Sequence, residues 1–164
     1  MRKVQRRVKR TRRGDYELRI PRVEREVLRA LPSRLRDLLS SDDPALSRLF
    51  PPAYGDDAER NEEFERLVRG DLLAHRMSSI DVMEATIDAE RVDEEQLLAW
   101  LGAINDLRLV LGTRLEVTEE EPPEILDSDP EAGAYALYYY LGWLQEQVIE
   151  ELASGIDPAG ASNT

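Results

Sequence analysis

Charged side chains within apolar helical faces are the first candidates for chemistry in this sequence. The stretch "NDLRLVLGTRL" has helical spacing, and Arg108 falls on its apolar face. In the segment 58–88, Asp71 and His75 also fall on the apolar face. A guanidinium that is buried without a partner costs several kcal/mol of desolvation. We therefore expect Arg108 to be buried and bound to a carboxylate of another helix, above all Asp71, in a buried polar network with His75 and Asn105.

Such a network has two interpretations. It could be a site that binds an anion or senses pH, or a structural salt bridge that fixes the register of two helices. Buried charges are usually paired within the fold, which favours the structural interpretation.

Signatures of catalysis are missing from the sequence. It contains no cysteine, which excludes thiolate nucleophiles, disulfides and thiolate zinc sites. His75 is the only histidine, and neither an HExxH motif nor the glutamate pattern of a di-iron bundle accompanies it. A nucleophile elbow, a Walker loop and a dinucleotide-binding glycine fingerprint are also absent. We expect no enzyme activity and no catalytic, cofactor-binding or metal-binding residues.

Positive charge is concentrated at the N-terminus. Residues 1–36 carry fourteen Arg or Lys and four Asp or Glu, whereas residues 37–164 carry eight and thirty, so the net charges of +10 and −22 give −12 in total. The basic side chains of the first strand and turn could contact phosphates of a nucleic acid or bind a partner: Arg6, Arg7, Lys9, Arg10, Arg12 and Arg13. Alternatively, they pair with the acidic remainder of the chain, which would repel DNA unless the basic arm projects from it.

The elements that would position these residues are mostly helices. The sequence predicts a mainly α fold, a helical bundle of about five helices with an N-terminal basic β-hairpin over about 3–20, turning at Gly14. We expect helices after Pro21 with a break at Pro32, a short one after Asp43, and longer ones over 58–88, 93–115 and 131–153. The 93–115 helix begins with a capping box, "DEEQ". We expect one domain over 1–153 and a flexible tail over 154–164.

The last helix carries two apolar faces. Leucines and a valine along one face should contact the core, whereas Tyr135, Tyr139 and Trp143 follow each other at spacing four on another. Either the hairpin or the helix at 22–39 covers these aromatic residues, or they form an interface with a partner or with a second copy in a homodimer.

The composition is that of a soluble protein. Hydrophobic residues make up 41% of the chain and charged residues 34%, and no apolar run is long enough for a membrane span or a secretory signal. Together with the lack of cysteine, this predicts a cytoplasmic protein without a membrane partner.

Three segments carry a family resemblance: "DPALSRLFPPAY" at 43–54, "NDLRLVLGTRL" at 105–115 and "YLGWLQEQVIE" at 140–150. With the order of elements, they make the chain resemble the actinobacterial oxidative-stress regulator family AosR, over nearly all residues up to about 153. Members of that family are often encoded beside the Clp adaptor ClpS.

The resemblance implies a mostly helical, non-enzymatic regulator of transcription that acts through protein partners such as a sigma factor or RNA polymerase. In the family, redox sensing is attributed to paired cysteines, so a disulfide switch does not carry over to a sequence that has none. The matching motif residues Asn105, Asp106, Arg108 and Arg114 are as easily structural as functional. Direct binding of nucleic acid by the hairpin and an accessory role in Clp proteolysis remain the alternatives.

Overall fold

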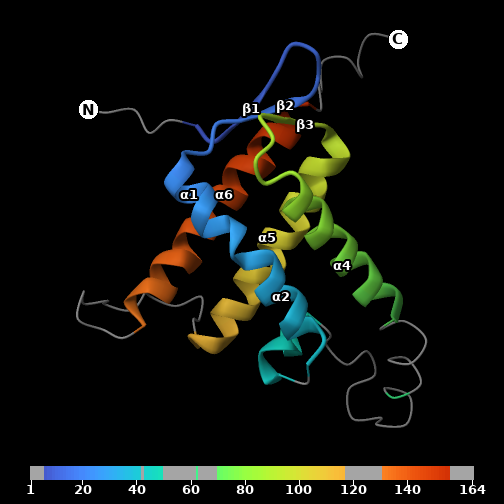
Figure 1. Cartoon of the computed structure of the whole chain (residues 1–164), viewed down its shortest axis with the longest axis vertical. Helices are drawn as coiled ribbons and strands as arrows, with labels where there is room; N and C mark the ends of the chain where they lie inside the picture. Colours follow the sequence, from blue (N-terminus) through green and yellow to red (C-terminus); the bar gives the residue numbers. More distant parts are fainter. Residues whose placement is uncertain (1–5, 42, 50–61, 63–69, 117–130, 156–164) are drawn as a thin grey trace.

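Figure 1 shows the computed structural model of the chain, which describes residues 6–41, 43–49, 62, 70–116 and 131–155. The predicted fold class, mainly α with an N-terminal hairpin, is confirmed. The described elements, in chain order, are β1 (Val8–Arg10), β2 (Tyr16–Leu18), α1 (Arg22–Arg29), α2 (Leu31–Leu39), the 3-10 helix η1 (Pro44–Arg48), α4 (Gly70–Ala85), β3 (Arg91–Val92), α5 (Glu94–Arg114) and α6 (Ala132–Ser154). Most of the helix expected before residue 70, and the tail at 156–164, lie outside the described residues.

Local sequence signals explain where several elements begin. Asp93 accepts a hydrogen bond from the backbone of Gln96, whose side chain accepts one from the backbone of Asp93, so the capping box predicted for α5 is confirmed. Gly14 has a φ of +93°, which a glycine adopts without strain in the hairpin turn. Pro32 lies in the first turn of α2, and the helix is interrupted at Ala30, between α1 and α2. This confirms the helix break expected at Pro32.

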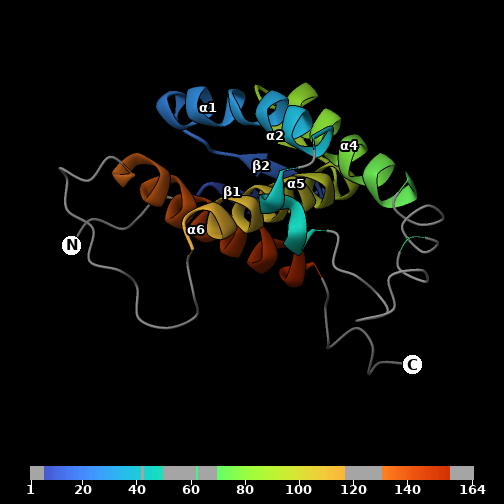
Figure 2. The same cartoon turned by 90° about the horizontal axis from the view of Figure 1, so that it is seen from below.

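Helix α5 is the centre of the molecule. It packs against α4 on one side and α6 on the other, and Figure 2 shows it between a layer of α1, α2 and α4 and the opposite helix α6. Trp100, Leu97 and Ile104 of α5 are at most 1% exposed. Since α5 is covered from two sides, the side chains on both sides have to be apolar or paired within the fold. Within the described residues, no helix is long and apolar enough to cross a membrane.

A three-stranded antiparallel sheet covers one end of the helices. The hairpin pairs Val8 with Leu18, and the unpredicted strand β3 extends the sheet by pairing Val92 with Tyr16. A strand of two residues has no periodicity that could reveal it in the sequence. On the other edge, the backbone amides of two hairpin residues, at positions 7 and 10, donate to the buried side chains of Gln147 and Glu151 of α6. Side chains of α6 thereby accept hydrogen bonds from backbone N–H groups at the edge of the sheet, which no other described strand pairs.

Arg25 of α1 ties the sheet to the helices. Its guanidinium donates to the carbonyl oxygens of Leu18, the last residue of β2, and of Ile20, just before α1, at 3.0 and 2.9 Å. It also donates to those of Ile87 and Ala89, between α4 and β3, at 2.7 and 3.1 Å. One side chain therefore satisfies four backbone acceptors from two separate segments.

Candidate functional site

The predicted pairing of Arg108 with Asp71 is wrong. Asp71 and His75 of α4 are exposed, and neither belongs to a buried network. The buried residues of α4 are Ser79, Ile80 and Met83, so its inner face is rotated away from the one that the sequence suggested. Arg76 lies on the same inner face, because it precedes Ser79 by three residues and Ile80 by four.

Arg108 is instead half-buried between α5 and α6. Its Nη1 donates to Oε1 of Gln145 at 3.1 Å, and Nε2 of Gln145 donates to Oδ1 of Asn105 at 3.1 Å. The guanidinium carbon lies 5.3 Å from the ring centroid of Tyr138, a cation–π contact. Among the described residues, no carboxylate pairs with Arg108, and its buried Nε has no hydrogen-bond partner. Arg108 and Asn105 thus share a network, but the third member is an amide.

The most deeply buried carboxylate among the described residues is that of Asp106, two positions before Arg108 on α5. It is 2% exposed and forms an ion pair with Nη1 of Arg76, whose Nη2 donates to the carbonyl oxygen of Leu49 at 3.2 Å. Burial raises the pKa of the Asp106 carboxyl, and the bond to Arg76 opposes that rise only in part. The pair connects α5 with α4 and the end of η1.

The sequence did contain a signal for Asp106. It lies three residues after Ala103 and four before Val110, and both are buried. This face of α5 meets α4, where Gly102 also approaches Ser79 closely. Arg108 lies on the opposite side of α5, which meets α6. A helix that packs on two sides has two apolar faces, and the helical periodicity of the sequence does not show which face meets which neighbouring helix.

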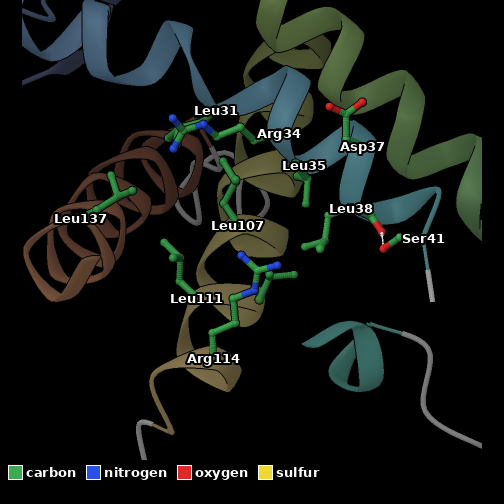
Figure 3. A pocket seen from close by; sticks show the side chains of 11 residues that line it. Leu31, Arg34, Leu35, Asp37, Leu38, Ser41, Leu107, Leu111, Arg114 and Leu137 are labelled. Atoms are coloured by element: carbon green, nitrogen blue, oxygen red, sulfur yellow. Dashed lines mark hydrogen bonds between the residues drawn. The ribbon is translucent and has the colours of Figure 1, made fainter. Parts of the chain in front are cut away.

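An apolar groove lies between α2, α5 and the first half of α6 (Figure 3). Its volume is about 440 Å³, and aliphatic side chains from all three helices line it: Leu31, Leu35, Leu38, Leu107, Leu111 and Leu137. Leu38, Leu111 and Leu137 are only half-buried and form its accessible surface. The groove forms where α2 and α6 both lie beside α5 and leave part of its last two turns uncovered.

Two guanidinium groups border this groove. In Figure 3, Arg34 of α2 and Arg114 of α5 reach over its leucine side chains, whereas Asp37 points away from them. Arg114 is bound to Asp43 at 2.9 Å, and Arg34 is exposed with no ion pair to any described residue. The groove is therefore apolar at its base, and its rim carries the Arg34 guanidinium, which has no ion pair among the described residues.

The basic residues of the hairpin divide into two groups. Arg6 pairs with Glu150 of α6 at 2.7 Å and Arg7 with Glu24 of α1 at 2.7 Å, so both bind carboxylates of their own chain, although only Glu150 belongs to the acidic segment 37–164. The remaining candidates are exposed and form no ion pair within the described part of the chain: Lys9, Arg10, Arg12 and Arg13. Figure 1 shows the turn between β1 and β2 projecting beyond the helices.

A polar cluster holds the start of the hairpin to α1 and α6. The hydroxyl of Tyr140 donates to Oε1 of Glu24 at 2.7 Å, and Arg7 lies 5.1 Å over the ring of Trp143. Burial of Glu24 alone would raise the pKa of its carboxyl, but the hydrogen bonds from Arg7 and Tyr140 outweigh burial and lower it. Burial and the bond to Glu24 raise the pKa of the Tyr140 hydroxyl.

The three aromatic residues predicted as an interface have different surroundings. Tyr135 donates from its hydroxyl to the carbonyl oxygen of Leu115, and Trp143 is covered in part by Arg7. Tyr139 is 40% exposed. The hairpin therefore covers one of the three, and a homodimer through this face stays a prediction. Among the described residues, no group of three or more His, Asp or Glu side chains is arranged to hold a metal ion.

Comparison with known proteins gives one family and a small set of relatives. The family described as "Domain of unknown function (DUF2017)" matches residues 2–152. The "Oxidative stress regulator AosR" of Mycobacterium bovis and that of Mycobacterium tuberculosis are each 30% identical over 125 residues, which cover 65% of this chain and 57% of the relative. The chain thus matches less than two thirds of the length of these curated relatives. No solved structure matches it.

Proposed function

Because the chain belongs to the DUF2017 family and is similar to mycobacterial oxidative stress regulators, we propose that it is a non-enzymatic regulatory protein that acts by binding a protein partner. The partner is a component of the transcription machinery, such as a sigma factor. A regulator of this kind needs a docking surface rather than a catalytic centre. The surface must also work without thiol chemistry, since the sequence contains no cysteine.

The observation that carries this proposal is the groove between α2, α5 and α6. Its half-buried leucines leave apolar surface in contact with water, and covering that surface would contribute roughly 25 cal/mol per Å². Its aliphatic side chains come from three helices, so the groove is preformed by the bundle. A preformed groove binds with little loss of its own conformational entropy.

The chemistry of the groove specifies its occupant. An amphipathic helix that inserts leucine-like side chains fits a groove of this kind, because anchors at spacings of three and four share one helical face. The Arg34 guanidinium at the rim has no ion pair with a described residue, so an acidic side chain beside the anchors would complete it. The occupant is therefore an acidic, leucine-bearing helix of the partner protein.

A peptide selection tests this chemistry without a known partner. Displayed random peptides selected on the full chain should be enriched in sequences with leucine-type anchors at helical spacing and Asp or Glu nearby. Arg34→Glu should weaken the best peptide by about tenfold, about 1.4 kcal/mol, because attraction at the rim becomes repulsion. The matched control is Arg22→Glu, an exposed arginine of α1 outside the groove, which should bind as the parent does. Enriched peptides that bind the parent and Arg34→Glu equally would refute the groove as the docking surface.

The exposed basic turn favours a second candidate function, direct binding of nucleic acid. Arg12 and Arg13 are exposed in the turn between β1 and β2, which projects beyond the helices in Figure 1, so their guanidinium groups could contact phosphates. The double variant Arg12→Glu/Arg13→Glu should then weaken binding to duplexes of unrelated sequence by a similar factor, and should lower the dependence of binding on salt by roughly 0.9 per lost phosphate contact. Fluorescence anisotropy at two salt concentrations measures both, with Arg22→Glu/Arg34→Glu as the control of equal charge. Equal binding by the two double variants would exclude the hairpin as a phosphate-binding arm.

A further inference from the structure

We propose that the pocket beside Arg108 is a binding site for a small monocarboxylate with a flat, apolar body. The pocket has a volume of about 400 Å³ and lies along the outer side of α6, apart from the leucine groove. Arg108 of α5 supplies its cationic end, and Tyr138, Tyr139 and Trp143 of α6 supply its aromatic walls. This site goes beyond the proposed docking function, because it would take a small molecule rather than a partner protein.

The first argument is the incomplete pairing of Arg108. A guanidinium has five N–H donors, and the described residues provide Arg108 with one acceptor, the neutral amide oxygen of Gln145. A half-buried arginine with a purely structural role is normally balanced by a carboxylate, as Arg76 is balanced by Asp106 in this molecule. Arg108 has no such partner among the described residues, so its positive charge remains available to an anion in the pocket.

The second argument is that the guanidinium is held in place. Gln145 binds Arg108 through its oxygen and Asn105 through its nitrogen, so the amide is fixed between the two. The ring of Tyr138 lies under the guanidinium carbon at 5.3 Å. A cation whose orientation is fixed beforehand loses less entropy when it binds a carboxylate.

The third argument is the glycine at position 142. A Cβ at Gly142 would lie 3.2 Å from Nε of Arg108 and 3.6 Å from its central carbon, a tight contact that would push the guanidinium away from the backbone of α6 by a small amount. Glycine in the middle of a helix is less favourable than alanine by about 1 kcal/mol. The close approach of Arg108 is the structural reason for that residue type here.

The remaining wall residues define the class of ligand. Tyr138, Tyr139 and Trp143 offer flat apolar surface, which an aromatic ring would cover. Glu146 also lines the pocket and is exposed. Its negative charge opposes a dianion such as a phosphate monoester more strongly than a monoanion, so the pocket favours carboxylates.

Benzoate is the probe for this site, and benzamide is its neutral counterpart of nearly the same shape. Titration of the full chain is followed by NMR of the two tryptophan indole N–H groups. Trp143 lines the pocket, whereas Trp100 is 1% exposed in the core and serves as an internal reference. Benzoate should shift the Trp143 signal in a saturable manner and leave that of Trp100 in place. Benzamide and phenyl phosphate should bind at least about tenfold more weakly.

Two variants assign the effect to Arg108. Arg108→Met should abolish the benzoate shift, whereas Arg22→Met, the same substitution at an exposed arginine of α1 outside both this pocket and the leucine groove, should retain it. Gly142→Ala should also weaken benzoate binding, although alanine favours the helix, because the added methyl displaces the guanidinium. Absence of a saturable benzoate shift in the parent, equal binding of benzamide, or full binding by Arg108→Met would each overturn the proposal. None of these results bears on the leucine groove, so the two proposals fail separately.

Discussion

Replacing Asp106 with alanine should lower the free energy of unfolding by about 3 kcal/mol, among the largest losses for any single side chain in this protein. Asp106 is 2% exposed and is paired with Arg76, so its removal leaves a guanidinium desolvated on one side. We place the loss at the lower end of the range for buried pairs because the Arg76 side chain is 22% exposed and can regain water. Urea unfolding followed by circular dichroism measures it.

A double-mutant cycle separates the ion pair from packing. Arg76→Met combined with Asp106→Ala should be less destabilising than the sum of the two single changes, because each single change leaves one charge without its partner. Additive losses would mean that the two charges do not interact. In that case Asp106 would not be the residue that joins α5 to α4.

The stability contribution of Asp106 should also depend on pH, and the direction of this dependence follows from its pKa. Because burial raises the pKa of Asp106 in the folded state, the folded chain keeps this proton over a pH range in which the unfolded chain has lost it. The proton-linked part of the contribution of Asp106 to stability is therefore fully present below the ordinary aspartate pKa and is lost as pH rises through the higher folded value, whereas the ionised carboxylate keeps its pairing with Arg76. The difference in unfolding free energy between the parent and Asp106→Asn should change in that direction as pH rises.

The second large effect is expected at Arg25. Arg25→Met keeps much of the aliphatic stem but removes the donors to four carbonyl oxygens at the junction of the sheet with α1 and α4. Hydrogen bonds to charged groups contribute about 1.5–3 kcal/mol each and are not additive, so we expect a loss of about 2–4 kcal/mol. Amide hydrogen exchange should in addition become faster in β2 and β3 than in α6.

Arg29 of the same helix is the matched control. It pairs with Asp88, but both side chains are well exposed, at 43% and 65%. Water screens exposed ion pairs such as this one, so Arg29→Met should be nearly neutral for stability. A similar loss for both variants would show that the carbonyl contacts of Arg25 are not what stabilises the junction.

The elements that could be predicted from the sequence are those with a local cause. The hairpin follows from alternating residues around Gly14, and α5 begins where its capping box places it. Strand β3 has only two residues and depends on β2 for its hydrogen bonds, so no local pattern reveals it. The role of Arg25 is equally invisible, because its four acceptors belong to the backbone and carry no residue type.

The candidate sites required the tertiary structure for a similar reason. The sequence predicted that Arg108 lies in an apolar seam, but its partner depended on which side of α5 faces which helix. Asp106 and Arg108 are two residues apart, which places them on opposite sides of the helix, and they contact α4 and α6 respectively. The leucine groove arises from three helices that are distant in sequence, and helical periodicity describes each of them only separately.

Cross-linking from within the groove tests the central claim most directly. A photoreactive amino acid at position 38 of α2 lies in the groove, and the same amino acid at position 98 of α5 replaces a leucine that is 49% exposed outside it. The account predicts that position 38, but not 98, cross-links in cells to a component of the transcription machinery, through a peptide that carries leucine and acidic residues, and that adding Arg34→Glu removes the product. Equal cross-linking from both positions, or a product that survives Arg34→Glu unchanged, would contradict it.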